Sequence, residues 1–550
     1  MLLLLLFAHV LFTSLWPLGE LFATAFRPGE DGTPLGLMAQ VLAARSTGRA
    51  LANTLATSAG SVAISAALGV SLALAMGLAR MRGQGVLTFL ILMPVIIPSQ
   101  TMALAWIELS GAGSPILGPL GLAPPQGRPN PLYSAEGIAL VMGVEHMPLV
   151  FLATRAALRA VPGDLVEAAR IAGVPRWRRL CSIVLPIAFP AVLASALLAF
   201  TAAVGNFGVP ALLGIPGRIT VLTTLIYQRL NGFGPSVAGQ VAVLALLLTA
   251  LAVAALALRT LLLRRLQVPL TAGRPIEPGP APPWVAAAVW LVVALIALAP
   301  LAALAMTALL PAIGVPFSLA TAGFEQFSQV LGNAGVRRAF ANSLFLALAA
   351  AAGCMLVALP YAYLYVHRRN LLLRLLDPLI EAPWVVPGTV VALGMILAFL
   401  NPLPVLELSL YGTMAILLIA YLARFLPLVL RPVAASAQMG DPALDEAARI
   451  AGAGLGRRLR AVFAPSVLPS AIAGGILVLM TALNELTLSA LLWSSGHETI
   501  GVMVFALQYE GNSTAAAAVS VLSTLLLLAI CLFTALCARW LPKGALPWQH

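Results

Sequence analysis

The chain has 550 residues, of which 61% are hydrophobic and only 9% are charged, with a mean hydropathy of +1.00. A soluble globular protein carries roughly 25% charged residues, so this composition excludes a soluble protein and predicts an all-α polytopic membrane protein. The net charge of +12 comes almost entirely from arginine. Because the arginines stand singly or in pairs between apolar runs, they indicate membrane topology and not a nucleic-acid-binding face.

Twelve apolar segments are long enough to cross a bilayer, which takes about 20 residues. In chain order they are residues 2–26, 50–79, 86–109, 134–154, 186–213, 236–263, 284–310, 339–366, 376–400, 409–430, 466–493 and 514–538. The first segment lacks a positively charged start, so we interpret it as a retained span and not as a signal peptide. Prolines at 94–98 and 383–387 predict either a break or a simple kink in the third and ninth spans.

The distribution of basic residues predicts the orientation. Placing the N-terminus in the cytoplasm puts 23 of the 31 Lys and Arg residues on the cytoplasmic side, Arg424 among them. Cytoplasmic loops of membrane proteins carry an excess of Lys and Arg. We therefore expect both chain termini in the cytoplasm, together with the segment EAARIAG, which occurs twice, at Glu167–Gly173 and Glu446–Gly452.

The chain reads as two related halves. RALANTL from Arg49 matches RAFANSL from Arg338, and MPVIIP at 93–98 matches APWVVP at 382–387, both at an offset of 289 residues. After a longer loop in the first half the offset is 279, and there Glu167, Gly173, Pro186 and Pro190 match Glu446, Gly452, Pro465 and Pro469. We therefore predict two parallel six-helix repeats, residues 1–266 and 284–550.

The segment QVPLTAGRPIEPGPAPP, residues 267–283, separates the two halves. Its proline content predicts an extended cytoplasmic linker and not a packed element.

Each half carries the same pattern around EAARIAG, over about 162–186 and about 439–465. Turn and cap residues come first, then a short helix with early acidic residues, then a glycine suited to a helix C-terminus. A basic cluster and the next apolar span follow. The pattern predicts a helix, a turn and a second short helix on the cytoplasmic face. A single copy would suit an ordinary amphipathic helix beside the membrane, whereas two matched copies indicate a paired docking surface.

The order E-A-A, three residues, Gly, then about nine residues to an apolar segment ending in Pro resembles the EAA loop of binding-protein-dependent ABC importer permeases. As a fused double permease, the whole chain resembles their iron(III)-type branch, whose relatives are proposed for thiamine, polyamines and phosphonates. The resemblance implies that two coupling helices dock on two copies of an ABC ATPase subunit. The matching residues are Glu167, Ala168, Ala169 and Gly173 in the first half, and Glu446, Ala447, Ala448 and Gly452 in the second.

The same resemblance implies a bacterial inner-membrane location and a separate periplasmic or lipid-tethered solute-binding protein. The expected partners also include membrane lipid, and no nucleic acid. We expect no enzyme and no cofactor in this chain, because it has no phosphate-binding G-x-x-x-x-G-K-[ST] motif and Lys543 is its one lysine. ATP and magnesium would then bind to the ATPase subunit.

Charged side chains inside apolar spans are costly and are functional candidates by default. The candidates for a translocation pathway are Glu108, Glu145, Glu381 and Glu485, with Asn206 and Asn484 nearby. Glu485 lies deepest and matches Asn206 at the offset of 279. The other three glutamates lie near predicted span boundaries, where they also suit helix capping or contact with water. An acidic lining favours a cation such as iron(III), thiamine or a polyamine over a phosphonate, and metal ligands stay unassigned.

Two other classes of function remain open. A secondary transporter driven by an ion gradient explains the spans and the duplication equally well, but not the two matched loops. A scaffold without transport predicts no uptake defect when the gene is deleted. The sequence does not identify the solute.

Overall fold

The computed structural model describes residues 2–28, 32–232, 236–266, 274–367, 371–402 and 407–536. Within these ranges the chain forms helices, loops and one pair of two-residue strands. Ten of the described helices are long and apolar enough to cross a membrane, and two bent helix pairs bring the number of candidate spans to twelve. The predicted all-α polytopic membrane fold is therefore confirmed.

In the first half, α1 (Leu2–Val10) and α2 (Trp16–Ala25) are joined by a π-helical turn at Leu11–Leu15. The elements that follow are α3 (Gly36–Ala43), α4 (Arg45–Leu78), β1 (Ala79–Arg80), α5 (Gln84–Ile96), α6 (Ser99–Ser110), α7 (Ala135–Ala160), α8 (Gly163–Ile171), α9 (Arg176–Arg179), α10 (Leu185–Gly205), α11 (Leu222–Leu230) and α12 (Val237–Arg265), with π-helical turns at Leu180–Val184 and Pro210–Gly214.

The second half follows a similar order. After β2 (Gly279–Pro280), which lies in the linker, its elements are α13 (Pro283–Val293), a π-helical turn at Ala294–Leu298, α14 (Ala299–Ala308), α15 (Glu325–Gly332), α16 (Ala334–His367), α17 (Leu371–Val385), α18 (Gly388–Phe399), α19 (Met414–Gln438), α20 (Ala443–Ile450), α21 (Leu455–Arg458), a π-helical turn at Leu459–Phe463, α22 (Ala464–Leu483), α23 (Ser489–Leu492), α24 (Ile500–Tyr509) and α25 (Ser513–Leu536).

The third and ninth spans are broken and not merely kinked. The pair α5 and α6 bends by 106°, and the pair α17 and α18 bends by 111°. The residue before a proline is disfavoured in the helical region, and Ile97, before Pro98, is extended at φ −77° and ψ 140°. We call the segments Ile96–Pro98 and Val385–Pro387, each from the last residue of the first helix to the proline, the first and second breaks.

Two predicted spans end earlier than expected, because polar side chains take over the backbone hydrogen bonds. α10 ends at Gly205 and not at 213, and Asn206 Oδ1 accepts a hydrogen bond from Val209 N at 3.1 Å. α22 ends at Leu483 and not at 493, and Glu485 Oε1 accepts one from Leu488 N at 2.7 Å. Such local side-chain bonds compete with helix continuation.

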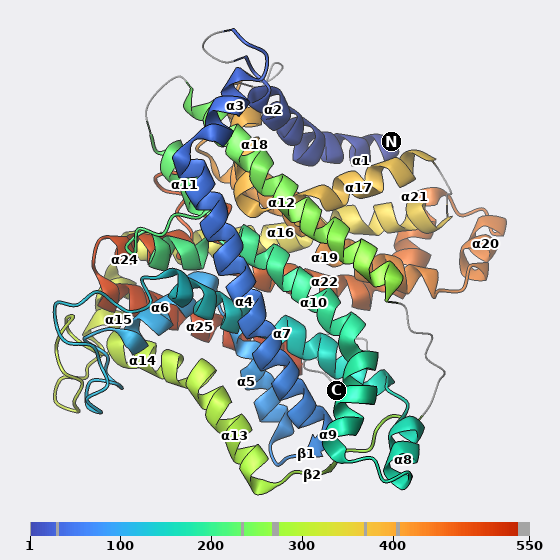
Figure 1. Ribbon diagram of the computed structural model, residues 1–550. Helices are drawn as coiled ribbons and strands as arrows, with labels where there is room; N and C mark the ends of the chain where they lie inside the picture. The colour runs from blue at the N-terminus through green and yellow to red at the C-terminus, as the bar shows by residue number, and fades with distance from the viewer. Residues whose placement is uncertain are drawn as a thin grey trace.

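The first span of each half packs against the other half. α2 lies on α18, where the ring centroids of Trp16 and Phe399 are 5.3 Å apart. α14 lies on α6, where Thr307 Oγ1 donates to Glu108 Oε2 at 3.1 Å. Figure 1 shows α1 and α2 along one edge of the molecule and α13 and α14 along the opposite edge. This exchange joins the two halves into one body.

The described part of the linker, 274–283, has no buried residue but makes backbone hydrogen bonds to the first half. β2 pairs with β1 in parallel, and Ala281 N donates to Arg80 O at 3.1 Å. Gly163 N donates to Arg274 O at 2.6 Å. Proline removes a backbone donor but keeps its carbonyl acceptor, so a proline-rich chain can still accept bonds from a neighbouring segment. The linker therefore lies against the end of α4 and the start of α8. Residues 267–273 lie outside the described residues.

Candidate functional site

The two EAARIAG segments form short helices that project from the same side of the molecule. Figure 1 shows α8 and α20 on the right, with α6, α15 and α24 on the opposite side. Neither helix contains a buried residue. A proline directly precedes the first residue of each helix, Pro162 before α8 and Pro442 before α20.

A glycine turn follows each helix, as the sequence predicts. Gly173 has a φ of +76° and Gly452 a φ of +78°, a left-handed conformation that glycine adopts without a Cβ clash. The turn directs the chain into α9 in the first half and α21 in the second. Each of these short helices continues through a π-helical turn into the next span.

Aliphatic side chains are exposed at equivalent positions of the two helices. Leu165 is 50% exposed and its equivalent Leu444 is 56% exposed. Ile171 is 80% exposed and its equivalent Ile450 is 86% exposed. Exposed apolar side chains that gather on one surface mark interaction sites. Two short polar helices that expose the same two aliphatic positions therefore present matched surfaces for a partner.

The charged residues hold the two helices in different ways. Asp445 of α20 pairs with Arg458 at 2.7 Å and accepts a hydrogen bond from Tyr363 Oη at 3.0 Å. The equivalent position in α8 is Val166, so α8 has no such pair there. Glu167 pairs with Arg170 at 2.8 Å, but both side chains are largely exposed, and an exposed ion pair contributes little to stability.

The pathway candidates do not form a single cluster. Glu145 and Asn206 lie together, because Asn206 Nδ2 donates to Glu145 Oε2 at 3.1 Å. Glu381 lies apart on α17 and pairs with Arg431 of α19. Glu108 lies on the contact with α14. Glu108, Glu145 and Glu381 thus each contact a side chain of a neighbouring helix.

Asn484 and Gly205, which are equivalent at the offset of 279, each contact the break of the other half. Asn484 Nδ2 donates to Ile96 O at 2.6 Å. A Cβ atom built on Gly205 would lie 3.5 Å from Pro387 Cβ. The segments Gly205–Gly208 and Asn484–Thr487 therefore lie where the two halves meet, each beside the opposite break.

Sequence reasoning missed Arg424. We expected it on the cytoplasmic side, but it lies near the middle of α19, where Nη1 donates to Val386 O at 2.9 Å and to Pro383 O at 3.2 Å. It also lies close enough to Glu485 for an electrostatic interaction. The available signal was its place inside an apolar span, opposite Glu145 at the offset of 279. Ser99, which donates to Glu145, was missed for lack of any charge.

Within the described ranges, no group of three or more His, Cys, Asp and Glu residues could hold a metal ion. The polar groups at the breaks are instead amides, hydroxyls and single charges from different helices.

Comparison with known proteins agrees with this architecture. The chain matches the family described as binding-protein-dependent transport system inner membrane component over residues 65–268 and 355–545. It is 31% identical over 411 residues to "Probable ABC transporter permease protein y4fN" of Sinorhizobium fredii, which covers 72% of this chain and 70% of that protein.

Two relatives from Escherichia coli match shorter stretches. The sulfate transport system permease protein CysT is 33% identical over 114 residues, 20% of this chain and 40% of CysT. The molybdenum transport system permease protein ModB is 30% identical over 123 residues, 22% of this chain and 54% of ModB. With one matched segment in each half, the chain belongs to the ABC transporter permeases that form the inner-membrane component of binding-protein-dependent transport systems.

Proposed function

We propose that this chain is the complete permease core of an ATP-driven importer, and that two copies of a separate ATPase subunit dock on α8 and α20. The observation that carries the proposal is the matched exposure of Ile171 and Ile450 on two equivalent helices on one side of the molecule. An aliphatic side chain at the end of a short exposed helix suits insertion into an apolar groove of a partner.

The residues around each isoleucine complete the proposed docking surface. Ala168, Ala169, Ala447 and Ala448 keep one face of each helix small, which lets a groove approach the backbone closely. Glu167 and Glu446 supply a carboxylate for a basic or polar group of the ATPase. Gly173 and Gly452 fix the angle at which each helix leaves the membrane surface.

In this proposal α8 and α20 face the cytoplasm, as do both chain termini, and the chain lies in the bacterial inner membrane. ATP and magnesium bind to the ATPase subunits. Closure of the two subunits moves α8 and α20, and the two halves respond by exposing the pathway to the outer side. A separate periplasmic or lipid-tethered binding protein then releases its solute, and hydrolysis returns the permease to the inward-facing state.

Iron(III) is the first cargo to test, with thiamine and polyamines beside it, since Glu145 and Glu485 suit a cation. Arg424 adds a positive charge near Glu485, so the second break does not carry negative charge alone. CysT is named for sulfate, which is an anion. A phosphonate and sulfate therefore belong in the same uptake panel.

The test replaces Ile171 and Ile450 by arginine, singly and together, and measures uptake of labelled iron(III), thiamine, putrescine, aminoethylphosphonate and sulfate in cells. We expect uptake of one solute to fall at least about tenfold in the double variant, at an unchanged amount of protein in the membrane. Leu319→Arg is the matched control, because Leu319 is 97% exposed but lies outside both helices. Uptake that survives in the double variant would favour a secondary transporter, and a gene deletion without any uptake defect would favour a scaffold.

A further inference from the structure

Glu145 and Arg424 occupy equivalent positions in the two halves and carry opposite charges. Pro148-Leu149-Val150 in α7 matches Pro427-Leu428-Val429 in α19 at the offset of 279, and the same offset relates Glu145 to Arg424. Both residues lie inside helices that span the membrane, α7 and α19. A duplicated position that keeps a charge but inverts its sign calls for a physical reason.

Arg424 holds the second break from its upstream side. Its Nη1 atom donates to the carbonyl oxygens of Pro383 and Val386, at 3.2 and 2.9 Å. α17 ends at Val385, so these carbonyls belong to the last helical turn and the break. The last carbonyls of a helix have no partner within it, and a cation is stabilised at the negative end of the helix dipole.

Glu145 holds the first break from its downstream side. It accepts hydrogen bonds from Ser99 Oγ and from Asn206 Nδ2. Ser99 is the first residue of α6, directly after Pro98. A carboxylate is stabilised near the positive, N-terminal end of a helix, so the sign of the charge at each position fits the helix end that it contacts.

The residues around each charge fit it as well. Gly388 occupies the position in α18 that Ser99 occupies in α6, at the offset of 289. A Cβ atom at Gly388 would lie only 3.0 Å from Thr487 Cγ2 and 3.4 Å from Arg424 Cζ. Serine therefore accompanies the glutamate and glycine accompanies the arginine, so the two sets of residues are not interchangeable.

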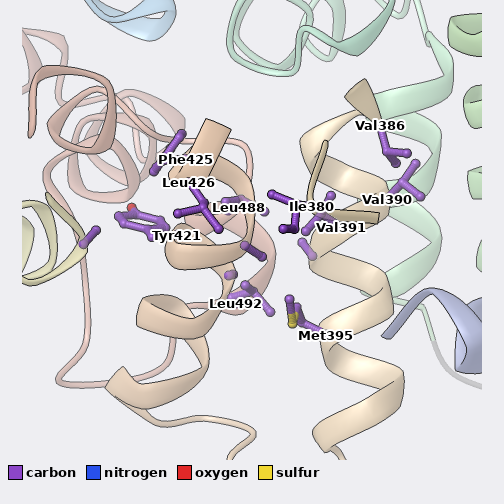
Figure 2. Close-up of a cluster of buried hydrophobic side chains, with 14 of the residues drawn as sticks. Ile380, Val386, Val390, Val391, Met395, Tyr421, Phe425, Leu426, Leu488 and Leu492 are labelled. Carbon is purple, nitrogen blue, oxygen red and sulfur yellow. The ribbon is translucent and has the colours of Figure 1, made fainter. Parts of the chain in front are cut away.

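The apolar surroundings explain why each break needs a charged residue. At the second break, Figure 2 shows the side chains of Ile380 and Val391 on the side that faces Leu488, and those of Val386 and Val390 on the other side of α18. All of them belong to one cluster of buried apolar residues. Ile97 is only 3% exposed and Val386 only 6%, so water has little access to the backbone at these two positions. A buried backbone group without a hydrogen-bond partner destabilises the fold, and a charged donor or acceptor offsets that cost.

We propose that Glu145 and Arg424 are positioning residues that fix the two breaks from opposite helix ends, and so set the contact between the halves. Each break touches the other half, through Ile96 and Asn484 at the first and through Pro387 and Gly205 at the second. The role of the breaks in solute passage rests on the proposed function. The positioning of the breaks by Glu145 and Arg424 does not depend on it.

The experiment uses the disulfide pair Gly205→Cys and Pro387→Cys in a chain whose four native cysteines are replaced by serine or alanine. The 3.5 Å between the two Cβ positions lies within the range of about 3.5–4.5 Å that disulfides require. The rate of copper-phenanthroline cross-linking in native membranes then reports the contact at the second break. It needs neither solute nor ATPase, so failure of the proposed function would leave this test intact.

In that background we expect Arg424→Gln to slow cross-linking about fivefold or more, and Arg424→Lys to keep most of the rate because it retains the charge. Arg229→Gln is the matched control: Arg229 bonds to Gln240 and Ser46 away from the breaks, and this variant should cross-link like the parent. The charge exchange Glu145→Arg with Arg424→Glu should stay slow, because each charge would then face the wrong helix end.

Cross-linking of Arg424→Gln at the parent rate would overturn the proposal. Recovery of the parent rate in the charge-exchanged double variant would also overturn it, since only the net charge would then matter. If Arg424→Gln does not accumulate in membranes, Arg424→Lys and Arg424→Met are compared in detergent-purified protein. Equal rates for these two variants would contradict the proposal, and a faster rate for lysine would support it.

Discussion

The side-chain amide of Asn484 donates a hydrogen bond of 2.6 Å to the backbone carbonyl of Ile96, from the end of α22 in the second half to the first break in the first half. The two residues are 388 positions apart in the chain. A bond of this kind exists only when both halves are assembled, so it reports the contact between them directly.

Replacement of Asn484 by leucine should destabilise the assembled halves. The carbonyl of Ile96 would lose its side-chain donor, at a cost of about 1–2 kcal/mol. Thermal unfolding of the purified protein in detergent should show a lower Tm. Asn231→Leu is the control, because the Asn231 side chain donates to Tyr227 O one helical turn earlier, within the first half. Equal Tm values for Asn484→Leu and the parent protein would contradict the importance of this contact.

The glycine turns after α8 and α20 should tolerate alanine poorly. Nothing lies within 4 Å of a Cβ at Gly173 or Gly452, so the cost comes from the positive φ alone and amounts to about 1–2 kcal/mol each. We expect Gly173→Ala with Gly452→Ala to weaken recovery of the ATPase with the tagged permease. Gly48→Ala serves as control, because Gly48 lies inside α4 with equal space around it. Equal recovery in both variants would show that the turn geometry does not matter for docking.

The ion pair between Asp445 and Arg458 should hold α20 against its neighbours. The Asp445 side chain is 15% exposed and the Arg458 side chain 14%. Removal of one partner therefore leaves the other charge poorly solvated. We expect Asp445→Asn to speed protease cleavage near α20 at least about threefold. Arg274→Gln breaks an exposed pair with Glu277 and should leave that cleavage rate unchanged. A protease-resistant Asp445→Asn protein would contradict this anchoring.

Glu498 should give the fold a pH-dependent contribution. It lies in the loop between α23 and α24, where burial alone would raise its pKa. The backbone donors and the charges of Arg338 and His497 outweigh burial, so the pKa of Glu498 lies below its ordinary value. A carboxyl with a depressed folded pKa stabilises the fold above its unfolded pKa, about 4.3, and this contribution disappears as the pH falls through the folded value.

We therefore expect Glu498→Gln to lower the Tm at pH 7 and to differ less from the parent protein as the pH falls below about 4.3. Arg338→Gln should reduce the effect, because it removes one of the charges that favour the carboxylate. A difference between Glu498→Gln and the parent that grows toward acidic pH would have the wrong sign for this account.

Much of the fold could be predicted from local patterns. Apolar runs of the right length predicted the twelve candidate spans, and glycines 173 and 452 predicted the turns after α8 and α20. Prolines 98 and 387 predicted an interruption of the third and ninth spans. Whether the span bends slightly or breaks depends on how the flanking helices pack, and no local pattern encodes that packing. The early ends of α10 and α22 depend on hydrogen bonds made by Asn206 and Glu485. Hydropathy averaged over a whole span does not reveal such single polar residues.

The polar groups at the breaks could be predicted only in part. Glu145 and Asn484 were candidates because polar groups in apolar spans are expensive. Arg424 was assigned to the cytoplasmic side because arginine usually marks topology. Its carbonyl partners lie in α17 and in the second break, 41 and 38 residues away. Contacts across that distance depend on the tertiary packing of α17 against α19.

Gentle detergent purification of the tagged chain, with mass-spectrometric quantification of its partners, tests most directly whether two ATPase subunits bind α8 and α20. We expect a separate ATPase subunit in about twofold molar excess over the permease, and we expect it to be lost when Ile171 and Ile450 are both replaced by arginine. A partner-free permease that still transports in vesicles without ATP would contradict the account and favour an ion-driven secondary transporter.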